Sequence, residues 1–83
     1  MEKELTFPFD LSGRLAIYFV QNVQNAVLNQ IQIGSSSRRV NAKSLLGVLS
    51  LGIKTGDKVS VFYKREEDFV AIEEIVRLLN DER

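Results

Sequence analysis

The sequence contains no histidine and no cysteine. Without cysteine, disulfide bonds and thiolate metal sites are excluded, and without histidine the most versatile acid–base group and metal ligand is missing. The acidic residues also lack the spacing of a calcium-binding loop. The sequence therefore shows no set of residues suited to nucleophilic or metal-assisted catalysis. We expect a non-enzymatic protein without a cofactor.

Long apolar runs are absent as well, so no stretch of the sequence is long enough for a membrane span. The start of the chain, Met1 to Glu4, has neither the basic end nor the apolar stretch of a signal peptide. Because a chain without cysteine is also compatible with a reducing compartment, we expect a cytoplasmic protein that does not bind membranes.

An excess of charge of one sign is missing too, since eleven basic residues balance eleven acidic ones. Bulk attraction to nucleic acid is therefore not indicated, and we expect no direct nucleic-acid partner. The charges are unevenly spread, with nine Lys or Arg against four Asp or Glu in residues 1–65, and two against seven in residues 66–83. The simplest interpretation of the acidic end is a solvated surface. A chain of 83 residues makes one domain, residues 1–83, with a small core.

Hydrophobic periodicity predicts the element order β-α-β-β-α-β-α. Alternating apolar residues predict strands near 4–9, 28–33, 40–42 and 59–64. Helical spacing predicts helices at 16–27 and 66–79, and a short apolar helix at 45–51. Pro8 cannot donate a ladder hydrogen bond, so the first strand should lie at a sheet edge or end there. Strands with one apolar face need cover on that face only, so the helices belong together on one side of a four-stranded sheet.

Both early helices carry more apolar residues than one inward stripe can hold. In the first helix the surplus is Leu15, Ile17 and Tyr18, which should be partly exposed and form a partner surface. In the short helix, Leu45, Leu46 and Leu49 cannot all face the core if Val48 and Leu51 do. Some of these leucines should therefore be exposed.

Ser44 precedes the short helix and has two interpretations. A phosphate there would meet free backbone N–H groups and the positive end of a helix dipole, with Lys43 adjacent and Arg38 and Arg39 in the preceding strand. Alternatively, Ser44 only caps the helix, a contribution of about 1 kcal/mol. On spacing alone, the cap is the favoured interpretation.

Three segments resemble a known family. The family is HPr, the small phosphocarrier of the bacterial sugar phosphotransferase system. The segments that resemble it, in the same order along the chain, are residues 40–52 (VNAKSLLGVLSLG), 55–59 (TGDKV) and 71–79 (AIEEIVRLL). The resemblance covers essentially the whole chain. It implies an α+β fold of the HPr type, an open-faced β-sandwich in which a four-stranded antiparallel sheet carries three helices on one face.

The chain departs from the family at the active site. Where the family has Thr/Ser-Gly-Leu/Ile-His-Ala-Arg-Pro-Ala, this chain has SGRLAIYF at residues 12–19. Two registers are open: without a gap, Leu15 stands for the histidine and Ile17 for the arginine. With a three-residue deletion, Arg14 takes the arginine's place and Leu15 the proline's, and this register fits the following helix better.

The resemblance implies a role for the serine that the chain keeps. Ser44 matches the regulatory serine that, in Gram-positive members, a dedicated HPr serine kinase phosphorylates as a signal to a catabolite-control transcription factor. A branch of the family that lacks the histidine keeps this serine and can form homodimers. The resemblance implies that Leu45, Leu46 and Leu49 form the apolar patch on which the kinase and the transcription factor dock. With Arg14 from the deletion register and the surplus of the first helix, the predicted partner-binding residues are Arg14, Leu15, Ile17, Tyr18, Leu45, Leu46 and Leu49.

Two other functions stay open. The chain is an oligomerising interaction module in which Ser44 is only a cap and Leu15, Ile17 and Tyr18 supply the contact surface. Alternatively, it is a phosphocarrier in name only, by similarity of sequence. All three interpretations share the same non-enzymatic character.

The missing histidine generates a first prediction. With phosphoenolpyruvate and the general enzyme of the pathway, this protein should gain no acid-labile phosphate, because no imidazole is available to form a phosphoramidate. Intact mass before and after acid treatment measures this, with a histidine-containing HPr as the positive control. A stoichiometric acid-labile phosphate on this chain would contradict the interpretation.

Overall fold

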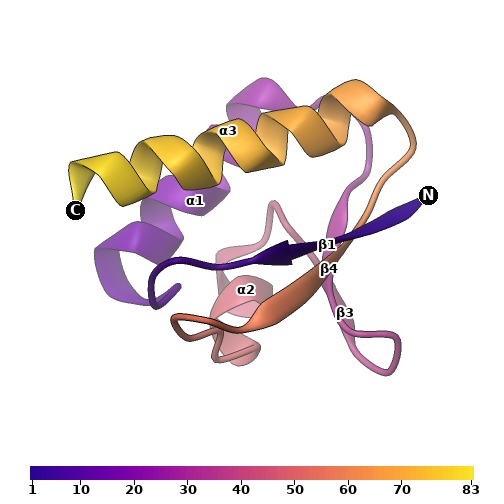
Figure 1. Cartoon of the computed structure of the whole chain (residues 1–83). Coiled ribbons are helices and arrows are strands. Elements are labelled where there is room, and N and C mark those ends of the chain that lie inside the picture. Colours follow the sequence, from indigo (N-terminus) through magenta and orange to yellow (C-terminus); the bar gives the residue numbers. More distant parts are fainter.

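A four-stranded antiparallel sheet forms one layer of the molecule. The computed structural model describes all 83 residues and orders the strands β1-β4-β2-β3 (Figure 1). The strands are β1 (Glu2–Thr6), β2 (Gln32–Gly34), β3 (Arg39–Asn41) and β4 (Lys58–Phe62). Every neighbouring pair is antiparallel. This is the sheet expected from the sequence.

Strand β1 begins and ends earlier than predicted. It covers residues 2–6 instead of 4–9, because Phe7 leaves the ladder and exchanges backbone hydrogen bonds with the turn before β4, donating to Asp57 and accepting from Gly56. Phe7 and Phe9 are buried all the same. The prediction from Pro8 is confirmed, since β1 lies at a sheet edge and ends before the proline.

Strand β2 is also shorter than its apolar pattern suggested. Leu28, which we counted as part of the strand, lies before it and is 91 % exposed. Ile31 and Ile33 are buried as expected, and Ile33 pairs with Val40 in the predicted hairpin with β3. The turn needs glycine at Gly34, because a Cβ there would lie 2.1 Å from the Arg38 carbonyl oxygen.

Three helices, α1 (Gly13–Ala26), α2 (Leu45–Ser50) and α3 (Glu66–Glu82), cover one face of the sheet. Figure 1 shows α3 running beside α1 above the strands, and α2 packs against α1 and β3. The apolar residues whose helical spacing predicted α1 and α3 are buried: Ala16, Phe19, Val20 and Val23 of α1, and Ile72, Ile75, Val76 and Leu79 of α3. All 21 buried hydrophobic residues form one core cluster. The other face of the sheet has no helix over it, so the open-faced architecture is confirmed.

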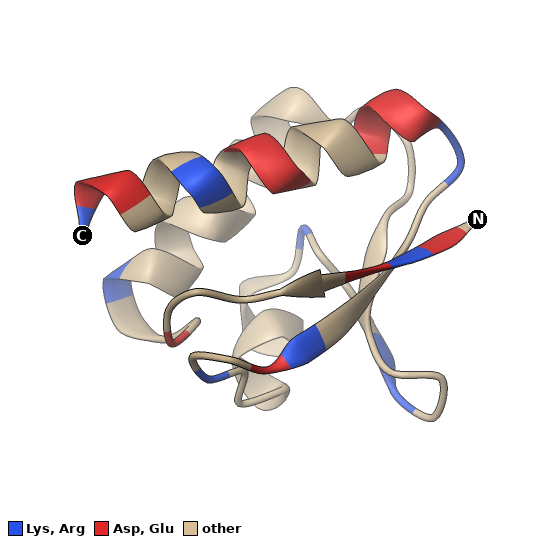
Figure 2. Ribbon diagram, viewed as in Figure 1, with Lys and Arg blue, Asp and Glu red and all other residues tan.

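The edge strand β1 is tied to the start of α3 by charge. Lys3 Nζ lies 2.6 Å from Glu66 Oε2, and the Tyr63 hydroxyl donates to Glu66 Oε1 at 2.9 Å. The hydrogen bond from Lys3, and then that from Tyr63, hold the pKa of Glu66 below its ordinary value of 4.5. Figure 2 shows this acidic first turn of α3 near the N-terminus of the chain. The acidic end predicted from the sequence is thus partly engaged in an ion pair.

The lowered pKa predicts an acid-dependent loss of stability. Because folding lowers the pKa of Glu66, its contribution is fully present above its unfolded pKa and is lost as the pH falls through the folded value. Glu66→Gln should therefore be less stable than the parent at neutral pH and equally stable once Glu66 is protonated. Denaturant unfolding at both pH values measures this, with Glu4→Gln as a control that removes an unpaired carboxylate. A difference that persists unchanged at low pH would contradict the role of the ion pair.

Candidate functional site

Ser44 stands at the start of α2 as the sequence predicted. Its backbone is extended (φ −108°, ψ 115°), and its Oγ accepts a hydrogen bond from the Gly47 N–H at 3.2 Å. The Ser44 carbonyl accepts the first helical hydrogen bond, from Val48 N at 2.9 Å. The N-cap role is therefore confirmed, because the side chain satisfies a donor that has no partner within the helix.

A preferred phosphorylation site is expected to expose its hydroxyl, and the Ser44 residue is half-buried. The hydroxyl lies against the first turn because it bonds Gly47 N, and Gly47 leaves the room it needs. A Cβ on Gly47 would lie 3.3 Å from Ser44 Oγ and 3.2 Å from Val40 Cβ. Glycine at this position thus allows the cap to sit between α2 and β3.

The basic residues near Ser44 in sequence do not all lie near it in space. Arg38 Nη2 donates to Ser50 Oγ at 2.7 Å, at the far end of α2. Arg39 lies over the Phe62 ring, 3.9 Å from its centroid, on the open face of the sheet. The expectation that both arginines support a phosphate on Ser44 is therefore wrong, because the hairpin carries Arg38 to the end of α2 and turns Arg39 outward. Lys43 is the basic residue that stays adjacent.

The leucines of α2 divide as a short helix requires. Leu46 is 81 % exposed and Leu49 is 40 % exposed. Leu45 is half-buried and packs against the core, and Val48 is buried. The prediction that some of the leucines are exposed is confirmed, and Leu45 is the one that mainly serves the core.

The surplus residues of α1 are exposed but lie on two sides of the helix. Ile17 and Tyr18 are each 42 % exposed, and Leu15 is half-buried. The Gln24 side chain donates to the Lys43 carbonyl at 2.9 Å, so its side of α1 faces the start of α2. Ile17 lies two helical turns before Gln24 and shares that side. We call Ile17, Leu46 and Leu49 the α1–α2 patch.

Arg14 lies away from Ser44. Together with Leu15 and Tyr18 it lines a pocket of about 390 Å³ whose other wall is the end of α3, from Leu79 to Arg83. Gln24, which reaches the Ser44 loop, is ten residues further along α1, a rise of about 15 Å. The deletion register predicts that Arg14 approaches a phosphate on Ser44 from the start of the neighbouring helix; no hydrogen bond joins the two residues in this structure. The predicted partner surface is thus two surfaces.

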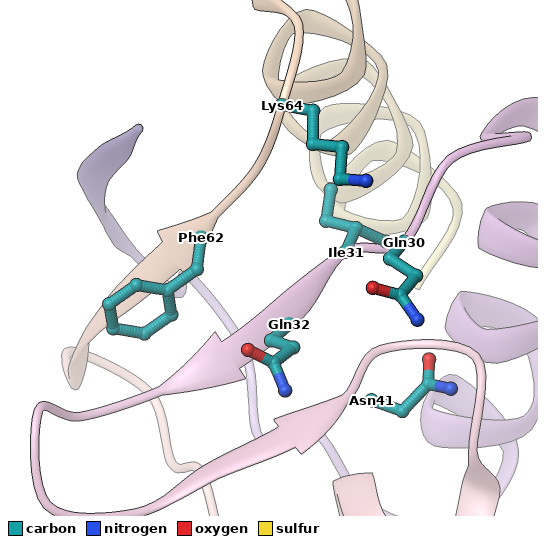
Figure 3. A pocket seen from close by; sticks show the side chains of 6 residues that line it. All are labelled: Gln30, Ile31, Gln32, Asn41, Phe62 and Lys64. Carbon is teal, nitrogen blue, oxygen red and sulfur yellow. The ribbon is translucent and has the colours of Figure 1, made fainter.

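The open face of the sheet carries a polar pocket that we did not single out from the sequence. It has a volume of about 230 Å³ and is lined by Gln30, Ile31, Gln32, Asn41, Phe62 and Lys64 (Figure 3). The signal was present, because Gln30 and Gln32 alternate with the buried isoleucines of the same segment and must face the other way.

The side chains offer no site for metal chemistry. No group of three or more Asp or Glu residues is arranged to hold a metal ion, and the chain has no histidine or cysteine to add. None of the helices combines the length and apolar character that crossing a membrane requires. What the site offers is a capping serine beside exposed leucines.

Comparison with known proteins agrees with the resemblance found in the sequence. The family model described as "PTS HPr component phosphorylation site" matches residues 3–81. The HPr-like protein Crh of Bacillus subtilis (strain 168) is 29 % identical over 79 residues, which cover 95 % of this chain and 92 % of that protein. HPr-C-His of Thermoanaerobacter tengcongensis has a similar structure, with a TM-score of 0.77 and 29 % identity over 98 % of this chain and 92 % of that one.

A second solved structure is that of the catabolite repression containing protein Crh of Bacillus subtilis, described as a dimer with a swapping domain. Its TM-score is 0.67, at 26 % identity over 93 % of this chain and 87 % of that chain. The sequence match and the βαββαβα fold therefore lead to one conclusion. The chain belongs to the HPr family, whose members are phosphocarrier or regulatory proteins and not enzymes, and within it is similar to Crh.

Proposed function

We propose that this chain is a non-catalytic regulatory member of the HPr family that is phosphorylated on Ser44 and acts by binding protein partners. The observation that carries the proposal is the position of Ser44, which caps α2 directly beside the exposed Leu46 and Leu49. The chain lacks the histidine on which phosphocarriers depend, and it keeps this serine. A signal on Ser44 is the remaining phosphoryl chemistry that the family resemblance offers.

The physical chemistry of the site favours a phosphate there. Phosphoserine carries a charge of about −1.5 to −2 near neutral pH. At the start of α2 it meets backbone N–H groups that have no partner within the helix, and Lys43 precedes it in the chain. Phosphorylation should therefore leave the fold intact and place a concentrated negative charge beside an apolar surface. A partner that recognises it needs basic residues next to an apolar groove.

We infer the class of partner from the relatives. Crh of Bacillus subtilis bears the name of a catabolite repression protein, and this chain resembles it over nearly its whole length. The corresponding partners are a serine kinase of the HPr type and a catabolite-control transcription factor in the cytoplasm. The α1–α2 patch is the contact surface that we assign to them.

The proposal predicts how Ser44 variants respond to the kinase. Incubation with ATP and an HPr serine kinase should add one phosphate to the parent and none to Ser44→Ala, as read by intact mass. Ser44→Ala should also unfold with about 0.5–2 kcal/mol less stability, because the Gly47 N–H loses its acceptor. Ser44→Asp should largely restore the cap without restoring the labelling.

The matched control is Ser37→Ala, which removes an exposed hydroxyl bonded only to another serine in the hairpin turn. It should label like the parent. Undiminished labelling of Ser44→Ala would show that another serine is the site, and no labelling of the parent would remove kinase regulation from the proposal.

A homodimer is a second candidate function, favoured by the dimeric structure of the Bacillus subtilis relative. The α1–α2 patch and the separate surface around Leu15 and Tyr18 supply apolar area for a second copy. If the chain is an oligomerising module, dimerisation does not depend on phosphate on Ser44. The two candidate functions are thus separable by experiment.

The dimer predicts a concentration-dependent mass. Light scattering during size-exclusion chromatography should show twice the monomer mass at high protein concentration, whether or not Ser44 is phosphorylated. Ile17→Ser should shift the equilibrium towards the monomer if the α1–α2 patch is the contact. Val70→Ser, which removes an exposed apolar residue of α3, is the matched control and should have no effect. A monomer mass over the whole range would contradict a homodimer.

A further inference from the structure

The open face of the sheet presents one row of side chains that no helix covers. Glu2, Phe62, Gln32 and Asn41 lie opposite one another in register across the four strands, so their side chains share a face. Phe62 is only half-buried, whereas Val59 and Val61 of the same strand point into the core. An aromatic ring thus lies in the middle of a polar surface.

The pocket beside this ring collects hydrogen-bonding groups that are largely unused within the chain. Three primary amides, from Gln30, Gln32 and Asn41, surround it together with the Lys64 ammonium (Figure 3). No hydrogen bond or ion pair within the chain occupies the side chains of Gln30, Gln32 or Lys64. Asn41 Oδ1 accepts from Lys43 N at 2.8 Å, which holds that side chain in place. No carboxylate lines the pocket.

We propose that this pocket binds a nucleotide, with the base against Phe62, the amides on the base edge and Lys64 on the phosphate. Aromatic side chains on an open sheet are a recurrent platform for unpaired bases, because every base has a flat face to stack. A primary amide carries a donor and an acceptor side by side, which matches the N6 and N7 positions of adenine. A lysine ammonium is a common partner for phosphate.

Arg39 contacts the Phe62 ring and fixes its position. Its guanidinium lies 3.9 Å from the centroid of the Phe62 ring, a cation–π contact that occupies one face of the ring, so a base stacks on the other face, and that adds positive charge beside the pocket. The ring is therefore positioned before a ligand arrives, which lowers the entropy cost of binding.

Size and charge limit the ligand to a single nucleotide unit. The volume of about 230 Å³ lies below the roughly 300 Å³ at which pockets for drug-sized ligands begin, so the pocket takes one base and the sugar and phosphate lie at its open side. Towards β1 the open face becomes acidic, because Glu2 lies directly opposite Phe62 and Glu4 follows on the same side of the strand. A nucleic-acid strand that crossed the sheet would place phosphates near these carboxylates. The half of the face formed by β4, β2 and β3 is the favourable one.

Titration with AMP, followed by ¹H–¹⁵N NMR, tests the proposal on the intact chain. The side-chain amides of Gln30, Gln32 and Asn41 should shift in a saturable way, together with the backbone around Phe62 and Lys64. Ribose 5-phosphate, which carries the same sugar and phosphate without the base, should bind roughly tenfold more weakly because it cannot stack. A short single-stranded oligoadenylate distinguishes the free nucleotide from a strand, and should bind no more tightly than AMP.

Substitutions of pocket residues test whether AMP binds in this pocket. Lys64→Glu and Gln32→Leu should each weaken AMP binding roughly tenfold, since each removes a hydrogen bond to the ligand and the first also reverses a charge. Lys58→Glu is the matched control, because Lys58 lies on the same strand and face but lines no part of this pocket, and it should bind like the parent. The spectra also report directly whether each variant is folded.

Three outcomes would overturn the proposal: no saturable shifts with AMP, equal affinity for ribose 5-phosphate, or an affinity that Lys64→Glu and Lys58→Glu reduce equally. A far tighter oligoadenylate complex would replace the single nucleotide with a nucleic-acid strand as the ligand. Because Ser44 takes no part in these contacts, phosphorylation results neither support nor weaken this inference.

Discussion

Strand β4 holds the sheet together. It pairs with β1 on one side and β2 on the other, so it joins the first strand of the chain to the central hairpin. Its inward residues, Val59 and Val61, are part of the core cluster beneath the helices, and its outward residue Phe62 lies on the open face. A slip of one residue in this strand would exchange the two sets and remove both the core contacts and the polar pocket.

The three helices contribute unequally to the core over this sheet. Helices α1 and α3 are long enough to bury a stripe of apolar residues each. Helix α2 has six residues, and Val48 is its only buried one. A helix of fewer than two turns cannot turn all of its leucines inward, and Leu46 and Leu49 stay at the surface beside Ser44. The exposed apolar surface is therefore a consequence of helix length.

The sequence predicted the parts of the fold that depend on local patterns. The order of the elements, the inward faces of α1 and α3 and the cap at Ser44 all follow from periodicity and from residues with one strong preference. The predictions were wrong where the bounds of a strand depend on pairing with segments that are distant in the sequence. Phe7 leaves β1 because the turn before β4 offers it backbone partners, and Leu28 stays exposed because the strand begins only where β3 and β4 can pair with it.

The candidate site shows the same division. That Ser44 caps a helix was predictable from a few neighbouring residues, but the surroundings of the cap were not. Arg38 and Arg39 are close to Ser44 in sequence, yet one lies at the end of α2 and the other on the open face. Proximity of this kind is set by hairpin register, and a periodicity argument contains no information about it. The polar pocket was missed for the related reason that outward polar residues are also what an ordinary solvated strand shows.

The chain keeps the HPr fold although it has no histidine. In this chain the first turn of α1 carries Arg14, and the core begins with Ala16 and Phe19, which hold the helix on the sheet. The scaffold therefore persists and presents other surfaces: the α1–α2 patch on the helical side and the amide pocket on the open face.

Asn41 is the residue at which these two surfaces meet. Its side chain lines the pocket and accepts from Lys43 N, while its carbonyl accepts from Ser44 N at 3.0 Å. A substitution of Asn41 would thus alter the loop that positions the cap as well as the pocket, and its effect on either would be ambiguous. Gln32 and Lys64 make no such contacts with the Ser44 loop. Their substitution changes one surface alone, and the independence of the two surfaces is itself a property that the structure makes measurable.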